Sequence, residues 1–152
     1  MNSLIIYSSK RGRTRGIARE IAEVLGSDLQ EIDTKKRDYD RYDLIGFGSG
    51  IFGWQHHPNL LDLAVSLPLM KGKKAFIFST APDGEKNMAV NHRKLRQKLE
   101  SRGLKIVGEF SCWGGNLLSI LNTNRAPSLK KLDPIDRIKA HNFAKELMEF
   151  DR

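Results

Sequence analysis

Cysteine is almost absent from this sequence, which holds a single one, Cys112, among 152 residues. One cysteine excludes an internal disulfide and fits a reducing compartment. Apolar runs of the ~20 residues that a membrane-spanning helix needs are also missing. No basic segment followed by an apolar stretch marks a signal peptide at the N-terminus. We therefore expect a cytoplasmic protein with no transmembrane segment.

Several motifs of ligand sites are missing as well. The chain has neither the G-x-x-x-x-G-K-[ST] loop nor the G-x-G-x-x-G loop that cradle nucleotide phosphates. The adjacent residues His56 and His57 have no nearby cysteine or carboxylate, so we interpret them as cap or surface residues and predict no metal site. Cys112 ends an apolar stretch and is interpreted as a small core residue.

The composition is that of an ordinary globular domain, with an excess of positive charge. Hydrophobic residues make up 39% and charged residues 29%. A chain of this length suits one domain, which we predict over residues 1–152. The net charge of +8 fits an anionic partner such as nucleic acid, an acidic protein or a membrane surface. The basic residues are spread along the chain, which favours the plainer interpretation of a basic surface.

Apolar runs alternate with amphipathic helical stretches, a pattern typical of parallel βαβ units. Strands are predicted at residues 3–8, 28–33, 43–48, 74–79 and 104–112, and helices at 14–25, 58–67, 88–102 and from 133 onward. We predict an α/β fold, a three-layer sandwich with a five-stranded parallel sheet of order 2-1-3-4-5 and helices on both faces. Segment 34–42 has room for one helical turn, and segment 113–132 is long for a plain loop, which indicates a functional or mobile segment.

Helical spacing predicts which side chains of the helices face the sheet. They are Ile17, Ile21, Val24, Leu25, Leu60, Leu61, Ala64, Val65, Leu95, Leu99, Ile135, Ile138, Phe143 and Leu147.

In this strand order a ligand crevice is expected beyond the carboxyl ends of the first and third strands, beside the fourth. The loop after the first strand carries Ser9, Lys10, Arg11, Gly12, Arg13 and Thr14. Exposed backbone N–H groups at a helix start bind anions, and the helix dipole favours negative charge there. The loop is predicted to hold a phosphate; the alternative is a plain strand-to-helix turn with a basic tip.

The loops after the third and fourth strands suit a flat ring system. The first of these is Ser49, Gly50, Ile51, Phe52, Gly53, Trp54 and Gln55, in which an aromatic side chain can cover a ring face. The second is Ser79, Thr80, Ala81, Pro82, Asp83 and Gly84, a small polar loop that can line the other side. The alternatives are aromatic plugs at the end of the sheet and an ordinary β–α turn.

With these three loops, the chain resembles the flavodoxin family. The phosphate loop of that family is S/T-x-T-G-N-T, which this chain matches at Ser9, Gly12 and Thr14. Arg11 stands where the family has the threonine of the third position, and Arg13 stands where it has the asparagine. Segments 42–49 and 72–80 are similar to the family's third and fourth strands.

The resemblance implies noncovalent binding of FMN and a role in electron transfer or as a small flavin oxidoreductase. Residues 9–14 would hold the FMN phosphate, and residues 49–54 and 79–84 would flank the isoalloxazine ring. The flavin performs the redox chemistry in such a site while the protein supplies binding, orientation and electrostatics. We therefore nominate no catalytic acid, base or nucleophile.

Two alternative functions stay open. Residues 9–18 are also similar to the first loop of the menaquinone-dependent protoporphyrinogen oxidases, which are basic and associate with membranes, and this resemblance implies a peripheral membrane contact. The other alternative is a flavin-free binding or nucleic-acid-interacting domain on the same fold. The basic helix 88–102 is the only feature that favours nucleic-acid binding, and no recognised nucleic-acid-binding motif accompanies it.

The charge of the chain sets it apart within the family it resembles, because many flavodoxins are acidic and dock on basic partners. A net charge of +8 leads us to expect an acidic redox partner protein, an anionic substrate or a membrane face. Arg11 and Arg13 would also stabilise a negatively charged reduced flavin, which predicts a less negative potential than in an acidic relative.

Overall fold

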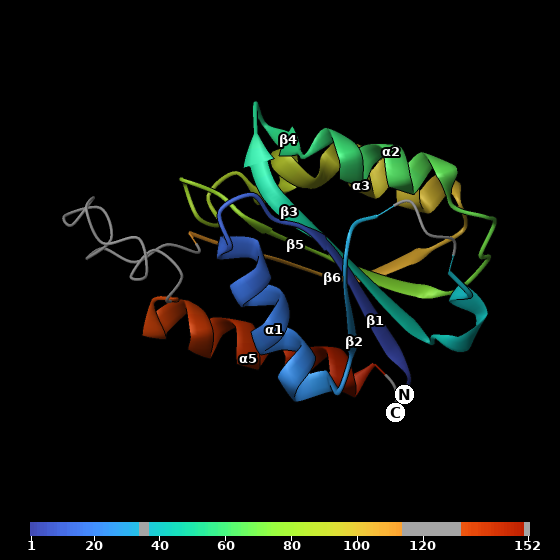
Figure 1. Cartoon of the computed structure of the whole chain (residues 1–152), viewed down its shortest axis with the longest axis horizontal. Coiled ribbons are helices and arrows are strands. Elements are labelled where there is room, and N and C mark those ends of the chain that lie inside the picture. Colours follow the sequence, from blue (N-terminus) through green and yellow to red (C-terminus); the bar gives the residue numbers. More distant parts are fainter. Residues whose placement is uncertain (34–36, 114–131, 151–152) are drawn as a thin grey trace.

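The computed structural model describes residues 1–33, 37–113 and 132–150. Its sheet has five parallel strands in the order β2-β1-β3-β5-β6, the predicted order when only the parallel strands are counted (Figure 1). The strands are β1 (Ser3–Ser8), β2 (Asp28–Glu31), β3 (Leu44–Phe52), β5 (Lys74–Thr80) and β6 (Lys105–Cys112). A two-residue strand, β4 (Gln55–His56), pairs antiparallel with the end of β3. The predicted α/β architecture is confirmed.

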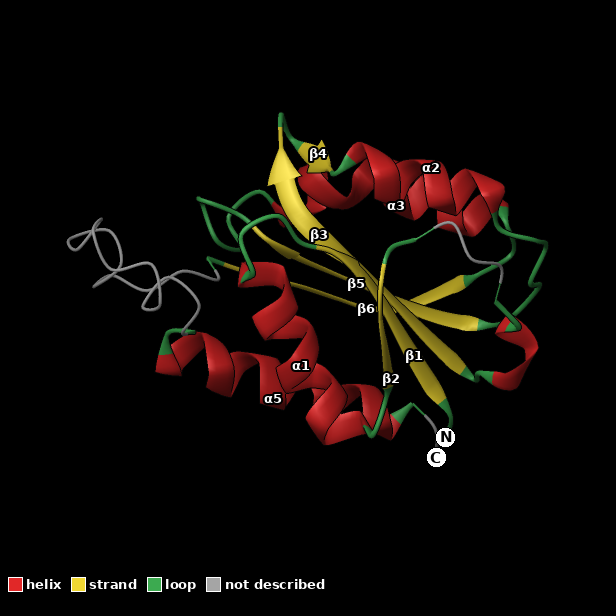
Figure 2. Cartoon of the chain, viewed as in Figure 1, coloured by secondary structure: helices red, strands yellow, loops and turns green. Residues whose placement is uncertain are grey.

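In the described part of the chain, four helices cover the two faces of the sheet: α1 (Arg13–Leu25) and α5 (Pro134–Glu149) on one, α2 (Pro58–Ser66) and α3 (Met88–Ser101) on the other (Figure 2). A single 3-10 turn at Tyr39–Arg41 fits the one turn expected there. Among the described residues, no helix combines the length and the apolar character needed to cross a bilayer. Most of segment 113–132, expected to be functional or mobile, lies outside the described residues.

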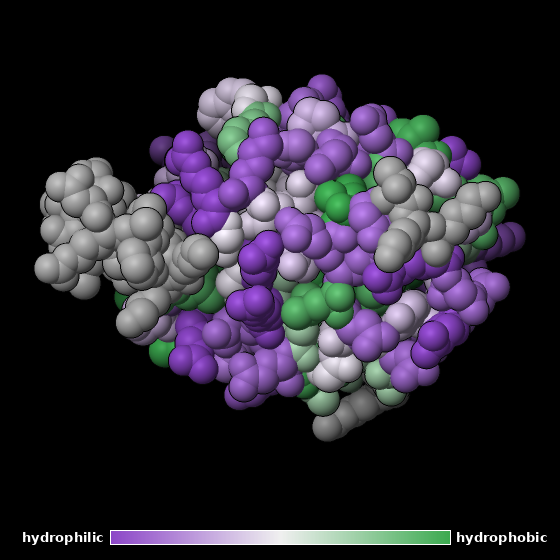
Figure 3. Space-filling model, viewed as in Figure 1, coloured by the Kyte–Doolittle hydropathy of each residue, from purple (hydrophilic) through white to green (hydrophobic). Residues whose placement is uncertain are grey.

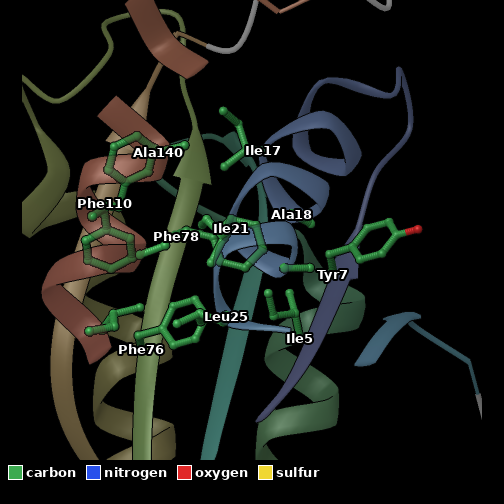
Figure 4. Packing of buried hydrophobic residues seen from close by; sticks show 14 of the residues in the cluster. Ile5, Tyr7, Ile17, Ala18, Ile21, Leu25, Phe76, Phe78, Phe110 and Ala140 are labelled. Atoms are coloured by element: carbon green, nitrogen blue, oxygen red, sulfur yellow. The ribbon is translucent and has the colours of Figure 1, made fainter. Parts of the chain in front are cut away.

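The core follows from the alternation of side chains along the strands. Ile5 and Tyr7 of β1 lie on the face covered by α1 and α5 and belong to the same buried cluster as Phe76, Phe78 and Phe110 (Figure 4). Leu4 and Ile6 point the other way and pack under α2 and α3. Both faces of the central strands are therefore buried, which explains why their sequences read as nearly continuous apolar runs.

Three side chains predicted to face the sheet are exposed instead: Val65 of α2, and Ile135 and Ile138 of α5. The buried stripe of α5 runs through Asp136, Ala140, Phe143, Ala144 and Leu147, and the two isoleucines lie off that stripe. The prediction was wrong because it counted Ile135 and Ile138 as apolar partners of Phe143, whereas the polar Asp136 occupies the buried position. Hydrophilic side chains cover most of the coloured surface in the view of Figure 3, as expected for the outer sides of amphipathic helices.

Candidate functional site

A hollow of about 160 Å³ opens at the carboxyl ends of β1, β3 and β5. This is the edge where the strand order reverses and where open α/β sheets bind ligands. Its walls are Ser8, Ser9, Lys10, Arg11, Arg13, Thr14, Gly50, Ile51, Phe52, His57, Thr80, Ala81, Pro82 and Trp113. The structure therefore brings the three predicted loops together around one space.

The first loop forms the basic end of the hollow. Gly12 is the N-cap of α1 with a positive φ of 83°, a conformation that glycine adopts at no steric cost. The N–H groups of Gly12 and Arg15 donate to Ser9 Oγ at 3.1 and 3.3 Å, which fixes the turn. The first turn of α1 contains no acidic residue. The loop thus presents a helix N-terminus and cationic side chains, the arrangement that binds a phosphate.

A buried hydrogen bond ties the first loop to the third. Thr14 Oγ1 lies 2.9 Å from Thr80 Oγ1, and both side chains are buried at the floor of the hollow. The pair fixes the start of α1 against the end of β5, so the basic end and the polar wall keep a defined separation.

The second loop is a β-hairpin, which corrects the expectation of a plain loop at residues 49–55. β3 continues to Phe52, and β4 returns after a turn in which Gly53 and Trp54 have φ values of 58° and 65°. Two consecutive positive φ values suit the twist of a two-residue hairpin. Trp54 is the only non-glycine residue with positive φ among the described residues, a conformation that costs about 1–3 kcal/mol.

The hairpin supplies the aromatic wall. Phe52 is 54% exposed on the hollow, with Lys10 Nζ 5.6 Å from its ring centroid and the His57 ring 5.9 Å away, edge to face. Trp54 is 63% exposed at the hairpin tip and does not line the hollow. Of the two aromatic candidates for covering a ring, the structure places only Phe52 there.

Several other predicted site residues also lie away from the hollow wall: Gly12, Ser49, Gly53, Ser79, Asp83 and Gly84. Ser49 and Ser79 are fully buried beneath it. Three wall residues were not predicted: Ser8, His57 and Trp113. Ser8 ends the first strand and Trp113 follows the last one, so the rule that strand ends meet at one edge could have found them. His57 depends on the hairpin, which the sequence pattern does not reveal.

The two adjacent histidines have different environments. His57 is the N-cap of α2, accepting from Asn59 N–H at 3.3 Å, which confirms the expectation of a cap residue. His56 is fully buried, so a surface position was the wrong expectation for it. His56 Nδ1 lies 2.9 Å from Ser49 Oγ, and its ring centroid lies 5.0 Å from that of His92 on α3.

The buried histidines have altered pKa values. Burial, and to a lesser degree His92, lowers the pKa of His56 well below its usual 6.5. Burial also lowers the pKa of His92, although Glu109 opposes this effect through a hydrogen bond and its charge. Burial works to raise the pKa of Glu109, but the hydrogen bonds and charges of His92 and Arg96 outweigh it and the pKa is lowered. At pH 7 both histidines are therefore neutral in the folded protein.

Acidification below pH 6.5 is expected to destabilise the fold. In the unfolded chain His56 and His92 take up protons at pH 6.5, whereas in the folded protein they do so only at lower pH, so stability is full above 6.5 and falls as pH drops. For His56, whose pKa lies well below its usual value, the loss is about 1.4 kcal/mol per pH unit, and His92 adds to it. Urea unfolding at pH 7.5, 6.5 and 5.5 measures it. A midpoint that does not change between pH 6.5 and 5.5 would contradict the burial of these rings.

These features define a class, the doubly wound α/β proteins with a basic anion loop at the point where the strand order reverses. A sequence profile of the flavodoxin domain matches residues 4–121. Uncharacterized protein MJ0298 of Methanocaldococcus jannaschii is 38% identical over 152 residues, which cover 98% of this chain and 99% of that protein. The chain belongs to the flavodoxin-domain family.

Several solved structures have the same fold. Oxidised flavodoxin 2 from Bacillus cereus aligns with a TM-score of 0.68 and 25% identity over 99% of both chains. A Fusobacterium nucleatum flavodoxin bound to flavin mononucleotide aligns with a TM-score of 0.67 and 12% identity, over 98% of this chain and 96% of that one. A Lactobacillus acidophilus flavoprotein in complex with FMN aligns with a TM-score of 0.60 and 20% identity, over 71% and 91%. The similarity to the protoporphyrinogen oxidases stays a prediction.

The residues present fit FMN. The basic end can take a doubly charged phosphate, since none of the described residues that line the hollow is acidic. Gly50 leaves space beside Phe52, because a Cβ there would lie 3.4 Å from the Phe52 ring and 3.8 Å from Thr80 Oγ1. The walls beyond the basic end are thus the Phe52 ring and the polar 79–84 loop. Gly50 at the end of β3 leaves the space between them open because it has no side chain.

Proposed function

We propose that this protein binds FMN in the hollow and acts in electron transfer or as a small flavin oxidoreductase. The observation that carries the proposal is the meeting of three loops around one space, with cations and a helix N-terminus at one end and Phe52 and the 79–84 loop at the other. Residues 9–14 would hold the phosphate, and the loops at 49–54 and 79–84 would flank the ring. Bound FMN would supply the redox chemistry.

The chain's own residues then bind, orient and adjust the site. Ser9 fixes the phosphate loop, the Thr14–Thr80 bond sets its distance from β5, and Phe52 covers one side of the ring space. Lys10, Arg11 and Arg13 neutralise phosphate charge at the opening.

Titration of the apoprotein with FMN and with riboflavin tests this proposal. Riboflavin carries the same ring without the phosphate, so we expect one FMN per chain to bind, with riboflavin at least tenfold weaker. Quenching of flavin fluorescence measures both affinities. Equal affinity for the two flavins would mean that residues 9–14 do not bind the phosphate. Failure of both flavins to bind would contradict the proposed function.

The redox potential of bound FMN is expected to reflect Arg11 and Arg13. Both side chains line the hollow, and positive charge there favours the more negatively charged reduced site. The variant Arg11→Thr/Arg13→Asn restores the neutral pattern of the flavodoxin family. Its midpoint potential, measured by spectroelectrochemistry, should be more negative than that of the wild type by roughly 30–60 mV, a tenfold change in the equilibrium constant. The same potential in both proteins would show that the two arginines do not influence reduction.

We further propose that the redox partner is an acidic protein that docks over the hairpin. Phe52 exposes aromatic surface on the hollow, and Trp54 exposes its ring at the hairpin tip. Exposed cations flank them: Lys10 over the Phe52 ring, and Lys94, whose Nζ donates to Gln55 Oε1 at 2.6 Å. Aromatic and basic side chains together suit a partner with a complementary acidic rim.

The rate of electron transfer to an acidic iron–sulfur protein should therefore fall with salt. We expect about a tenfold decrease between 0.01 and 0.15 M salt, as the Debye length shrinks from ~30 to ~8 Å. Stopped-flow measurements would follow it, with Lys94→Glu slowing transfer at low salt. Lys71→Glu is the matched control, since it changes the net charge equally at the other end of the sheet. A rate that rises with salt would point to a basic partner.

A further inference from the structure

A row of buried polar side chains lies behind the hollow, between the sheet and α3. Ser49, Ser79 and Ser111 occupy the same register on β3, β5 and β6, so they point to one face of the sheet. All three are buried, and the rings of His56 and His92 lie against them. Burying this much polarity is costly unless every group is hydrogen-bonded.

The hydrogen bonds around His92 require two donors from its ring. Ser111 Oγ donates to the Gly84 carbonyl at 3.0 Å, and Ser79 Oγ donates to Ser111 Oγ at 2.8 Å. A hydroxyl has one hydrogen, so Ser79 can only accept from His92 Nε2 at 2.7 Å. On the other side, His92 Nδ1 lies 3.1 Å from a Glu109 carboxylate oxygen, which also accepts.

Complete satisfaction of this network therefore needs a protonated His92, while burial favours the neutral ring. A neutral His92 leaves either the Glu109 contact or the Ser79–Ser111 chain without its hydrogen. The charged and titratable groups that face His92 are Glu109 from β6, Arg96 from its own helix and His56 from β4. With one partner carboxylate and an adjacent ring, His92 has a neutral and a protonated arrangement, and a nearby charge can shift the balance between them.

The network reaches both solvent and the hollow. Glu109 is partly exposed and accepts from Arg96 Nε at 3.2 Å, which opens a route to solvent at the edge strand β6. At the inner end, Ser111 bonds the carbonyl of Gly84 in the third loop, and Ser49 Oγ donates to the carbonyl of Gly50 in the hollow wall at 2.8 Å. Thus each loop expected to flank the ring is hydrogen-bonded to a serine of this row, and the row in turn contacts His56 and His92.

We propose that His92 takes up a proton from solvent when the cofactor site gains an electron, so that reduction is coupled to protonation of this buried histidine. The proposal rests on the proposed function and extends it to the regulation of the same site. One electron enters from the donor and one proton enters His92 through the Glu109 edge, so the total charge is unchanged and no covalent bond of the protein breaks. Added negative charge at the ends of β3 and β5 selects the protonated arrangement.

Two measurements on the full chain test the coupling. The first is the midpoint potential of the FMN-loaded protein between pH 5 and 8.5, compared with His92→Gln. We expect the plot of midpoint potential against pH to show a bend in the wild type that is absent from the variant. Any bend caused by protonation of the flavin itself should appear in both proteins. His141→Gln, on α5, is the control for loss of an imidazole and should keep the bend. An identical profile in wild type and His92→Gln, with FMN bound to both, overturns this proposal and leaves the proposed function standing.

The second measurement follows the ring directly by nitrogen NMR of labelled histidine. His92 should titrate below pH 6.5 in the apoprotein, and its proton affinity should rise on the order of tenfold when the loaded protein is reduced. Ser79→Ala, which keeps the ring but removes the link toward Gly84, should diminish that rise. Glu109→Gln should move the titration to lower pH, and it serves in place of His92→Gln if that variant does not fold. A His92 titration that is the same in oxidised and reduced protein overturns the proposal.

Discussion

Reversing the charges at the phosphate end, in Arg11→Glu/Arg13→Glu, should weaken FMN binding by about 100-fold or more. Both side chains line the hollow beside the N-terminus of α1, whose first turn carries no acid that could already repel a phosphate. A hydrogen bond to a charged group contributes about 1.5–3 kcal/mol, and 1.4 kcal/mol is a tenfold change in affinity. Two reversals remove two attractions and add repulsion.

Riboflavin separates the phosphate effect from damage to the ring site. It lacks the phosphate, so its affinity should change less than about threefold in the same variant. The matched control is Lys71→Glu/Lys105→Glu, which alters the net charge equally at the opposite end of the sheet. Fluorescence titrations of both flavins against all three proteins give the comparison. If riboflavin weakens as much as FMN does, the two arginines do not lie at the phosphate.

Replacing Gly48 by alanine should cost about 3 kcal/mol of folding free energy, at the upper end of the range for overpacked cores. A Cβ at Gly48 would lie 2.3 Å from Cε2 and Cζ of Phe78, its register partner on β5. Phe78 is fully buried and packs beside Phe76, so it cannot move aside without disturbing the core. Glycine at this position is thus required by the ring of the neighbouring strand.

A compensating substitution makes this prediction specific. Phe78→Leu removes the ring atoms that the new Cβ would meet, at its own cost in packing. Urea unfolding should therefore find the double variant Gly48→Ala/Phe78→Leu more stable than the sum of the two single effects. Strict additivity would mean that the clash with Phe78 is not the cause.

The sheet and the turn from β1 into α1 could be predicted because their signals are local. An apolar run such as residues 3–8 specifies a buried strand by itself, and Gly12 after it marks the turn into the helix. That this turn binds a phosphate stays a prediction. The meeting of the three loops then follows from strand order, which right-handed crossovers restrict to few choices. Local periodicity and topology rules together were sufficient for this part.

The hairpin could not be predicted in the same way. Its return strand has two residues, too few to show alternation, and its turn is Gly53–Trp54 rather than the usual Asn-Gly or Asp-Gly. The pairing of β4 with β3 exists only in the folded chain, and it moves Trp54 away from the hollow while bringing His57 to it.

The buried histidine network could not be predicted from the sequence, for a related reason. Its members lie far apart in sequence, with His56 on β4, His92 on α3 and Glu109 on β6. Nothing in the neighbourhood of each residue distinguishes a buried histidine from an exposed one. Only the register that aligns Ser49, Ser79 and Ser111 on one face reveals the site.

The central claim, that this basic flavodoxin-family chain holds FMN in the hollow, is tested most directly by its flavin content. The full chain would be purified without added flavin, its absorption spectrum recorded, and any released cofactor identified by mass; residual apoprotein would then be titrated with FMN. We predict a yellow protein that releases FMN and binds it up to one per chain. A colourless protein that also fails to bind added FMN would contradict the account.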